Sequence, residues 1–329
     1  MKVADMHCDT IAEIYAKRQA GEECGILKNN LHIDLEKMER GDYAVQNFAV
    51  FAHMENLKGK MPLPEYALRL IDTFFTELRR YPDRIGIVRS FRDIEKNMAE
   101  GRMSALLTME EGAICQGKLE YLRIFYELGV RMFTFTWNFP NELAYPNRYE
   151  YLGPGQDSFV PETEKGLTEK GFEFLEEMER LGMIIDVSHA SDGTFRDIMA
   201  IAKGTVIASH SNCREIAKHP RNLTDEMIWQ LADAGGIAGL NLYGPFLGRE
   251  KESRIEDMTA HILHMLNKGG SDFPAIGTDF DGFGEMEVME IGHPDEMEKL
   301  WEILKQKGVK ESQLDKIWYR NAMRVLKSI

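Results

Sequence analysis

Short apolar runs alternate along this chain with longer segments whose apolar residues recur at helical spacing. Runs rich in β-branched and aromatic residues predict strands at residues 2–7, 46–53, 104–110, 130–137, 183–189, 205–210, 236–243 and 274–280. Apolar residues at i, i+3 and i+4 predict helices at residues 64–80, 118–129, 169–182, 193–202, 224–236 and 255–270. Several of these helices end at a glycine, which favours left-handed caps at Gly129, Gly182, Gly235 and Gly269.

Regular alternation of strand and helix predicts an α/β fold with a parallel sheet covered on both faces. Eight strand–helix units favour a closed (β/α)8 TIM barrel. The alternative is an open doubly wound sheet, which usually carries a Gly-rich phosphate loop after its first strand, and no such loop is present here. The chain has 329 residues, of which 43% are hydrophobic, so we expect one barrel domain spanning residues 1–329.

Charge and composition exclude several classes of function. The net charge of −14 disfavours a nucleic-acid partner. The four cysteines are widely spaced and form no C-x-x-C pair, so neither a disulfide framework nor a thiolate zinc site is indicated. We find no signal-peptide pattern, and no apolar stretch approaches the roughly 18 residues that a transmembrane helix needs. We therefore expect a reduced, cytoplasmic protein without a membrane partner.

Ionisable side chains lie at the ends of five of the predicted strands. In chain order these are His7 and Asp9, Glu110 and Glu111, His189, His210, and Asp279. Catalytic groups of a barrel come from the carboxyl ends of different strands, so we expect these side chains to converge on one mouth. Alternation along a strand places His7 and Asp9 on one face and Cys8 on the other.

Imidazole and carboxylate ligands suit Zn²⁺, and also Mn²⁺ or Co²⁺. Three histidines with one Asp and one Glu are too many ligands for a single catalytic zinc, but they suit two ions that share a bridging carboxylate. Two ions about 3.5–4 Å apart can hold a hydroxide and polarise a carbonyl. Asp279 could then take and return the proton. The pattern predicts metal-dependent hydrolysis of an amide or a similar bond.

Each of these residues also has an ordinary structural interpretation. His189 or His210 alone fits a hydrogen-bonded core histidine, Asp279 fits a turn residue, and Glu110 fits a helix cap. Their shared position at the ends of separate strands favours the metal site. Five of the other histidines are assigned to helix faces or loops, although His53 also ends a strand. They are His53, His219, His261, His264 and His293.

Nine segments of the chain match a known family in the family's order. They read "DMHCDT", "NNLHIDLEKMERG", "LLTMEEGA", "LGVRMFTFTWN", "IIDVSHAS", "VIASHSN", "HPRNLTDE", "GTDFDG" and "RNAMRVL". Together they resemble the membrane (renal) dipeptidases and their bacterial relatives, metallopeptidase family M19 of the amidohydrolase superfamily. The resemblance implies a (β/α)8 barrel with a two-zinc centre that cleaves small dipeptides, often with a D-residue at the C-terminal position.

The resemblance also implies the metal ligands. His7 and Asp9 would hold one zinc, His189 and His210 the other, and Glu110 would bridge them. Glu111 stands where relatives often have glycine, so the bridging position could fall on Glu111 instead, and a strand's pleat allows only one of the two to face the mouth. In many amidohydrolases a carboxylated lysine bridges the ions, but no lysine ends a predicted strand here, which agrees with a glutamate bridge.

Further residues take their expected roles from the same resemblance. Arg221 matches the arginine that binds the substrate carboxylate, a role that suits the guanidinium fork. Asp279 matches the proton-shuttling Asp that also meets the substrate's amine. Asp281 is expected to support the site from behind, and Tyr243 to line the pocket. Relatives are often dimers, so the resemblance also implies a homodimer.

Trp137 departs from the family pattern. The mammalian enzymes have a substrate-contacting histidine at the end of the fourth strand, whereas an indole offers one N–H donor and cannot carry a proton. We expect Trp137 to line the substrate pocket. The leading hypothesis is a zinc dipeptidase acting on L-Xaa-L/D-Xaa dipeptides. An N-acyl-amino-acid deacylase with the same centre and a non-enzymatic metal-binding barrel are the alternatives.

Overall fold

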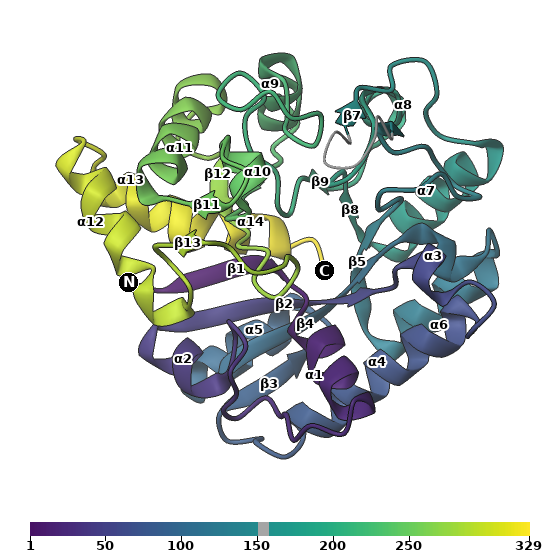
Figure 1. Ribbon diagram of the computed structural model, residues 1–329, viewed down its shortest axis with the longest axis horizontal. Coiled ribbons are helices and arrows are strands. Elements are labelled where there is room, and N and C mark those ends of the chain that lie inside the picture. The colour runs from purple at the N-terminus through teal and green to yellow at the C-terminus, as the bar shows by residue number, and fades with distance from the viewer. Residues whose placement is uncertain (151–157) are drawn as a thin grey trace.

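The computed structural model describes residues 1–150 and 158–329 and contains a barrel of eight parallel strands, shown in Figure 1. Around the barrel the strands follow the order β10-β12-β1-β2-β4-β5-β8-β9. They are β1 (Val3–Cys8), β2 (Tyr43–Phe51), β4 (Met103–Glu110), β5 (Val130–Thr134), β8 (Ile184–Asp186), β9 (Val206–Ile207), β10 (Ala238–Leu240) and β12 (Pro274–Ile276). All eight overlap strands expected from the sequence.

A bridge between Ala208, just after β9, and Ala238 of β10 joins the two ends of this sheet. Ala208 N donates to Ile237 O at 2.9 Å, and Gly239 N donates to Ala208 O at 2.9 Å. The neighbouring backbones approach closely here, because a Cβ added at Gly239 or Gly277 would lie within 2 Å of Ser209 O. The predicted (β/α)8 TIM barrel is confirmed.

Within the described residues, five further strands lie outside the barrel order. β3 (Ile85–Val88) pairs with the first half of β4, and β5 pairs with the second half of β4. The others form two small pairs, antiparallel β6 (Arg148–Glu150) with β7 (Ser158–Val160) and parallel β11 (Glu252–Ser253) with β13 (Val288–Met289). β3 was not expected from the sequence, because its four residues, IGIV, give too short an apolar run to stand out.

Helices surround the barrel (Figure 1). The α-helices are α1 (Thr10–Gln19), α2 (Leu35–Arg40), α3 (Met54–Leu57), α4 (Leu63–Leu78), α5 (Phe91–Ala99), α6 (Leu119–Leu128), α7 (Glu169–Leu181), α8 (Asp192–Ile201), α9 (Asp225–Asp233), α10 (Gly244–Leu247), α11 (Ile255–Gly269), α12 (Glu298–Gln306), α13 (Glu311–Asp315) and α14 (Asn321–Leu326). Shorter turns are η1 (Gly112–Cys115), η2 (Pro294–Glu296) and the π-helical η3 (Lys316–Arg320). No helix in the described ranges is long and apolar enough to span a bilayer.

Side-chain caps begin several helices, and glycines with positive φ end several of them. The Thr168 hydroxyl accepts from Gly171 N at 3.1 Å and begins α7, which ends at Gly182 with φ 72°. The expected cap at Gly269 is wrong by one residue. Gly269 is the last residue of α11, and Gly270 takes the positive φ of 77°.

The buried apolar side chains of the described residues form two clusters. The larger lies between strands and helices and includes Cys8, as expected for the residue between His7 and Asp9. The second cluster contains strand residues that come before the strand ends, such as Leu106 and Ile184. These residues pack with Val325 and Leu326 of α14. Because these positions are apolar, the ionisable side chains are concentrated at the carboxyl ends of the strands.

Candidate metal centre

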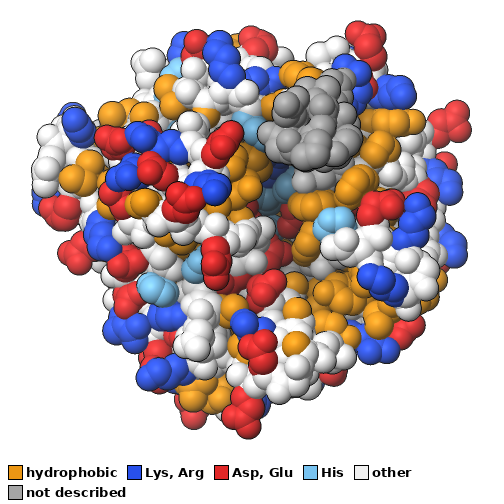
Figure 2. Space-filling model, viewed as in Figure 1, with side chains coloured by type: hydrophobic (Ala, Val, Ile, Leu, Met, Phe, Trp, Pro, Cys, Tyr) orange, Lys and Arg blue, Asp and Glu red, His pale blue; other side chains and the backbone are white. Residues whose placement is uncertain are grey.

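A cavity of about 750 Å³ opens at the carboxyl ends of the barrel strands. Figure 2 shows this face hollowed near its middle, with hydrophobic side chains gathered around the hollow. The lining includes Asp9, Glu110, His189, Arg221, Tyr243 and Asp279. Side chains separated by up to 270 positions in sequence therefore meet in one buried, partly apolar space, which is the usual form of a ligand site.

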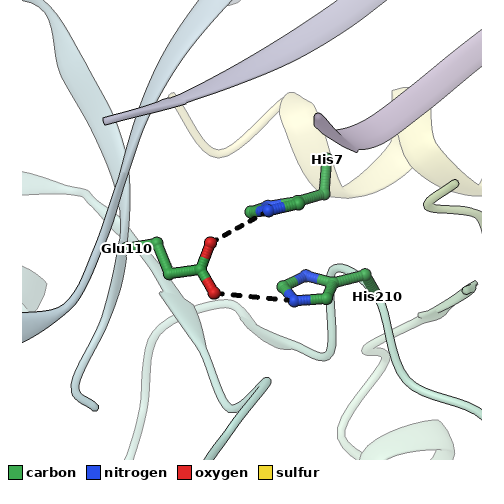
Figure 3. A group of neighbouring side chains, drawn as sticks. All are labelled: His7, Glu110 and His210. Atoms are coloured by element: carbon green, nitrogen blue, oxygen red, sulfur yellow. Dashed lines mark ion pairs between the residues drawn. The ribbon is translucent and has the colours of Figure 1, made fainter. Parts of the chain in front are cut away.

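The Glu110 carboxylate lies between two groups of ligands. Its Oε2 is 3.0 Å from His7 Nε2, and its Oε1 is 2.9 Å from His189 Nε2 and 3.8 Å from His210 Nε2. Figure 3 shows the two oxygens pointing toward His7 and His210 from opposite sides of the carboxylate. One carboxylate thus presents a separate oxygen to each group.

The group around His7 is rich in carboxylates. His7 Nε2 lies 3.2 Å from Asp9 Oδ2 and 3.8 Å from Asp279 Oδ1. Asp9 Oδ1 is buried and has no hydrogen-bond partner among the described residues. A buried carboxylate oxygen without a partner is costly, and a cation would satisfy it.

The second group consists of two imidazoles whose Nε2 atoms are 3.1 Å apart. His189 Nδ1 lies 3.1 Å from the amide oxygen of Asn138, which can only accept, so His189 carries its hydrogen on Nδ1. His210 Nδ1 lies 2.7 Å from Ser209 Oγ. When Nδ1 carries the hydrogen in both rings, the two Nε2 lone pairs face each other, and a shared cation would remove their repulsion. The residues therefore fit a divalent metal ion.

Burial and charge keep these imidazoles neutral. Burial lowers the pKa of His189 to about 4, and the positive Arg221 guanidinium acts in the same direction. Burial likewise lowers the pKa of His210 well below its ordinary value, with further lowering from His7 and Arg221. Neutral imidazole is the form that binds metals.

The pKa values of Glu110 and Asp279 shift in opposite directions. Burial alone would raise the pKa of Glu110, but His7 and His189 outweigh it and hold that pKa below its usual range. Burial raises the pKa of Asp279 to about 7, with the Asp9 and Glu110 carboxylates adding to the rise and His7 opposing it. Glu110 is therefore set up as a permanent anion, and Asp279 as a group that can exchange a proton near neutral pH.

Glu111 points away from the cavity. Its Oε1 accepts from Ala113 N at 2.9 Å and from Asn141 Nδ2 at 2.6 Å, and its Oε2 accepts from Trp137 N at 3.4 Å. The backbone at Glu111 has φ 92°, which ends the strand and turns the chain into η1. Of the two glutamates left open by the sequence, the structure brings Glu110 to the mouth.

Positive backbone φ values orient two other site residues. His189 has φ 65° and Asp279 has φ 61°, a conformation that non-glycine residues adopt at a cost of about 1–3 kcal/mol. A Cβ added at the neighbouring Gly282 would lie 2.2 Å from Asp279 Oδ1 and 2.5 Å from Asp9 Oδ2. The absent side chain leaves room for these two carboxylates to approach each other.

All three residues expected to bind substrate line the cavity, namely Arg221, Trp137 and Tyr243. Arg221 is only 8% exposed and donates from Nη1 to Ser211 Oγ at 2.6 Å and from Nη2 to His210 O at 2.9 Å. Its buried Nε has no partner in the described parts of the chain. Trp137 lies 4.7 Å from the His53 ring, and His53 itself is not among the cavity-lining residues.

Asp281 accepts from Thr10 Oγ1 at 2.6 Å and from His32 N at 2.7 Å. These bonds tie the loop after β12 to the segments that follow β1. Asp281 is not among the residues that line the cavity, and its supporting role stays a prediction.

Sequence reasoning missed several residues of the site. Asn138 orients His189, Ser209 orients His210, and the Asn241 amide donates to Asp279 Oδ2 at 2.8 Å. His219 was assigned to an ordinary loop, yet its ring lines the cavity. Their position in the sequence could have identified three of these residues, because Asn138, Ser209 and His219 lie within two residues of a predicted site residue.

Comparison with known proteins identifies the family. Residues 1–329 match the family described as membrane dipeptidase (Peptidase family M19). An uncharacterized dipeptidase of Schizosaccharomyces pombe is 30% identical over 316 residues, which cover 90% of this chain and 72% of that protein. The dipeptidase verJ of Clonostachys rogersoniana is 28% identical over 317 residues, which cover 91% of this chain and 76% of that protein.

Solved structures share the fold. A metallo peptidase from Rhodobacter sphaeroides, liganded with a phosphinate mimic of the dipeptide L-Ala-D-Ala, has a TM-score of 0.85 at 24% identity and covers 100% of this chain and 99% of its own. The probable dipeptidase PvdM from Pseudomonas aeruginosa has a TM-score of 0.79 at 20% identity and covers 94% and 91%. The family expected from the motifs is confirmed: the chain belongs to the membrane dipeptidase family, peptidase family M19, and is a metallo-dipeptidase by class.

Proposed function

We propose that the protein is a binuclear zinc dipeptidase that hydrolyses the peptide bond of small L-Xaa-L/D-Xaa dipeptides. The observation that carries this proposal is the Glu110 carboxylate, with one oxygen 3.0 Å from His7 Nε2 and the other 2.9 Å from His189 Nε2. A carboxylate so placed suits a bridge between two cations, which two-metal hydrolases use.

The residues divide naturally between two ions. His7 and Asp9 would hold one, His189 and His210 the other, and Glu110 would contact both. The orphaned Asp9 Oδ1 and the facing Nε2 atoms of the two histidines support this division. Zn²⁺ suits these ligands, as would Mn²⁺ or Co²⁺. Two bound ions would supply a bridging hydroxide nucleophile and polarise the scissile carbonyl.

The chain's own side chains then position the dipeptide. Arg221 offers its unpaired Nε–H and a remaining Nη–H to the C-terminal carboxylate. Asp279, held by Asn241, would bind the substrate's ammonium and move the proton to the leaving amine. Trp137 and Tyr243 would shape the apolar walls. The dipeptide-mimic complex of the Rhodobacter sphaeroides relative supports a dipeptide-sized ligand.

A substrate panel combined with metal analysis tests the proposal. The purified, zinc-loaded protein is assayed on L-Xaa-L-Xaa and L-Xaa-D-Xaa dipeptides and on the N-acetylated form of each, and its zinc content is measured per chain. We expect two zinc ions and cleavage of free dipeptides. Preferential cleavage of the acetylated forms would instead identify an N-acyl-amino-acid deacylase. No cleavage of either set by the two-zinc protein would favour a non-enzymatic metal-binding barrel.

A further inference from the structure

Asp186, the last residue of β8, is buried beneath the metal centre and touches none of the proposed ligands directly. It is 1% exposed and accepts four hydrogen bonds. Its Oδ1 accepts from Ser188 N at 3.0 Å and Ser209 N at 2.9 Å. Its Oδ2 accepts from Ser209 Oγ at 2.5 Å and Thr134 Oγ1 at 3.0 Å. One carboxylate thus joins the ends of three adjacent strands.

The hydrogen bonds around Ser209 have a defined direction. A carboxylate accepts only, so the single hydroxyl hydrogen of Ser209 points to Asp186. Ser209 Oγ must then accept from His210 Nδ1, which lies 2.7 Å away. His210 therefore carries its hydrogen on Nδ1 and presents the Nε2 lone pair to His189 and Glu110.

We propose that Asp186 is a positioning residue that fixes the metal-binding tautomer of His210 through the Ser209 hydroxyl, and so controls the affinity of the two-histidine half of the centre. This inference rests on the proposed function for the presence of two ions. The tautomer itself is a property of the chain without metal. Outer hydrogen bonds of this kind orient metal-bound imidazoles and raise their basicity.

Asp186→Asn should reverse the chain of hydrogen bonds. The two backbone N–H groups of Ser188 and Ser209 require an acceptor, so the asparagine oxygen would stay with them. Its NH₂ group would then face the Ser209 hydroxyl, which can rotate. Ser209 would accept from the amide and donate to His210 Nδ1, which moves the imidazole hydrogen to Nε2. That hydrogen would occupy the metal-binding position.

The chain supplies a matched control in Asp5. This buried carboxylate of β1 also joins two neighbouring segments, since it accepts from Thr278 Oγ1 at 2.6 Å, from Thr278 N at 3.0 Å and from the backbone His7 N at 3.3 Å. The Thr278 hydroxyl, however, accepts from Phe280 N at 3.2 Å rather than from an imidazole. Asp5→Asn therefore disturbs a comparable set of hydrogen bonds, but it does not change which ring nitrogen of a histidine carries the hydrogen.

The test measures metal retention against increasing chelator in the wild type, Asp186→Asn, Ser209→Ala and Asp5→Asn. We expect Asp186→Asn to lower the affinity for one of the two ions by about 10- to 100-fold. Ser209→Ala should lower the same affinity by less, because it frees the tautomer without reversing it. Asp5→Asn should keep both ions at the wild-type affinity. Wild-type retention in both Asp186→Asn and Ser209→Ala, or an equal loss in Asp5→Asn, would overturn the proposal.

Nitrogen-15 spectra of the metal-free proteins provide a second readout, with the His210 signals assigned by their loss in His210→Gln. We expect an Nδ1–H imidazole in the wild type and an Nε2–H imidazole in Asp186→Asn. An Nε2–H tautomer in the wild type would overturn the proposal. If the wild type shows the Nδ1–H form but binds fewer than two ions, the proposed binuclear function fails and the tautomer assignment stands. If Asp186→Asn does not fold, Ser209→Ala and the wild-type spectrum still decide the outcome.

Discussion

Replacing Arg221 by methionine should remove the recognition of the substrate's C-terminal carboxylate. Ser211 Oγ and His210 O hold the guanidinium through one hydrogen each on Nη1 and Nη2. The Nε–H has no partner among the described residues and each Nη keeps a second hydrogen, so these are the donors that we assign to the substrate carboxylate. Methionine keeps an unbranched apolar stem but lacks the guanidinium, so the change removes the donors and the charge.

The size of the effect follows from the two hydrogen bonds that the fork can make. A hydrogen bond to a charged group contributes about 1.5–3 kcal/mol, so two such bonds contribute roughly 3–6 kcal/mol. That range corresponds to roughly 10²- to 10⁴-fold in kcat/KM. The wild type should therefore prefer a dipeptide over its C-terminal amide by a factor in this range.

The assay compares kcat/KM for a dipeptide and its amide on the same enzyme preparation, so that the ratio does not depend on the active fraction. In Arg221→Met the ratio should fall to near one. Lys218→Met is the control, because Lys218 is an exposed cation on the same cavity wall, and the ratio should stay at the wild-type value. A wild-type ratio in Arg221→Met, or a ratio near one in the wild type, would refute the role given to Arg221.

Three other predictions concern the bridging glutamate, the proton-transfer group and a buried histidine of α11. Glu110→Gln should lower the bound metal below two ions per chain, whereas Glu111→Gln should leave it at two; metal loss in the second variant alone would move the bridge to Glu111. Asp279→Asn should keep both ions but lower kcat by roughly 10²- to 10⁴-fold, and unchanged turnover would exclude it as the proton-transfer group. Burial lowers the pKa of His261 to about 4 from an ordinary 6.5, so its neutral form contributes stability that is fully present above pH 6.5 and is lost as pH falls toward 4. That shift corresponds to about 3 kcal/mol in the free energy of unfolding. In denaturation experiments at pH values from 7 to 4, the free energy of unfolding should therefore fall less in His261→Gln than in the wild type.

Hydrophobic periodicity along the chain was enough to predict the eight barrel strands and the residues at their ends. This succeeded because buried parallel strands are continuous apolar runs, and an ionisable residue at the end of such a run stands out. His7 and Asp9 are an example, since one intervening residue keeps both on the same face of β1. The motif order then indicated the family from local sequence alone.

The tertiary structure decided how those residues interact. The choice between Glu110 and Glu111 depended on a backbone φ of 92° at Glu111, which strand alternation does not specify. The bond from Ser209 to Asp186 joins residues 23 positions apart, and His219, in the segment between β9 and α9, lines the cavity beside side chains from other strands. Side-chain direction at a strand end and the partners of a hydrogen bond arise from packing between distant segments, so they became visible only in the folded chain.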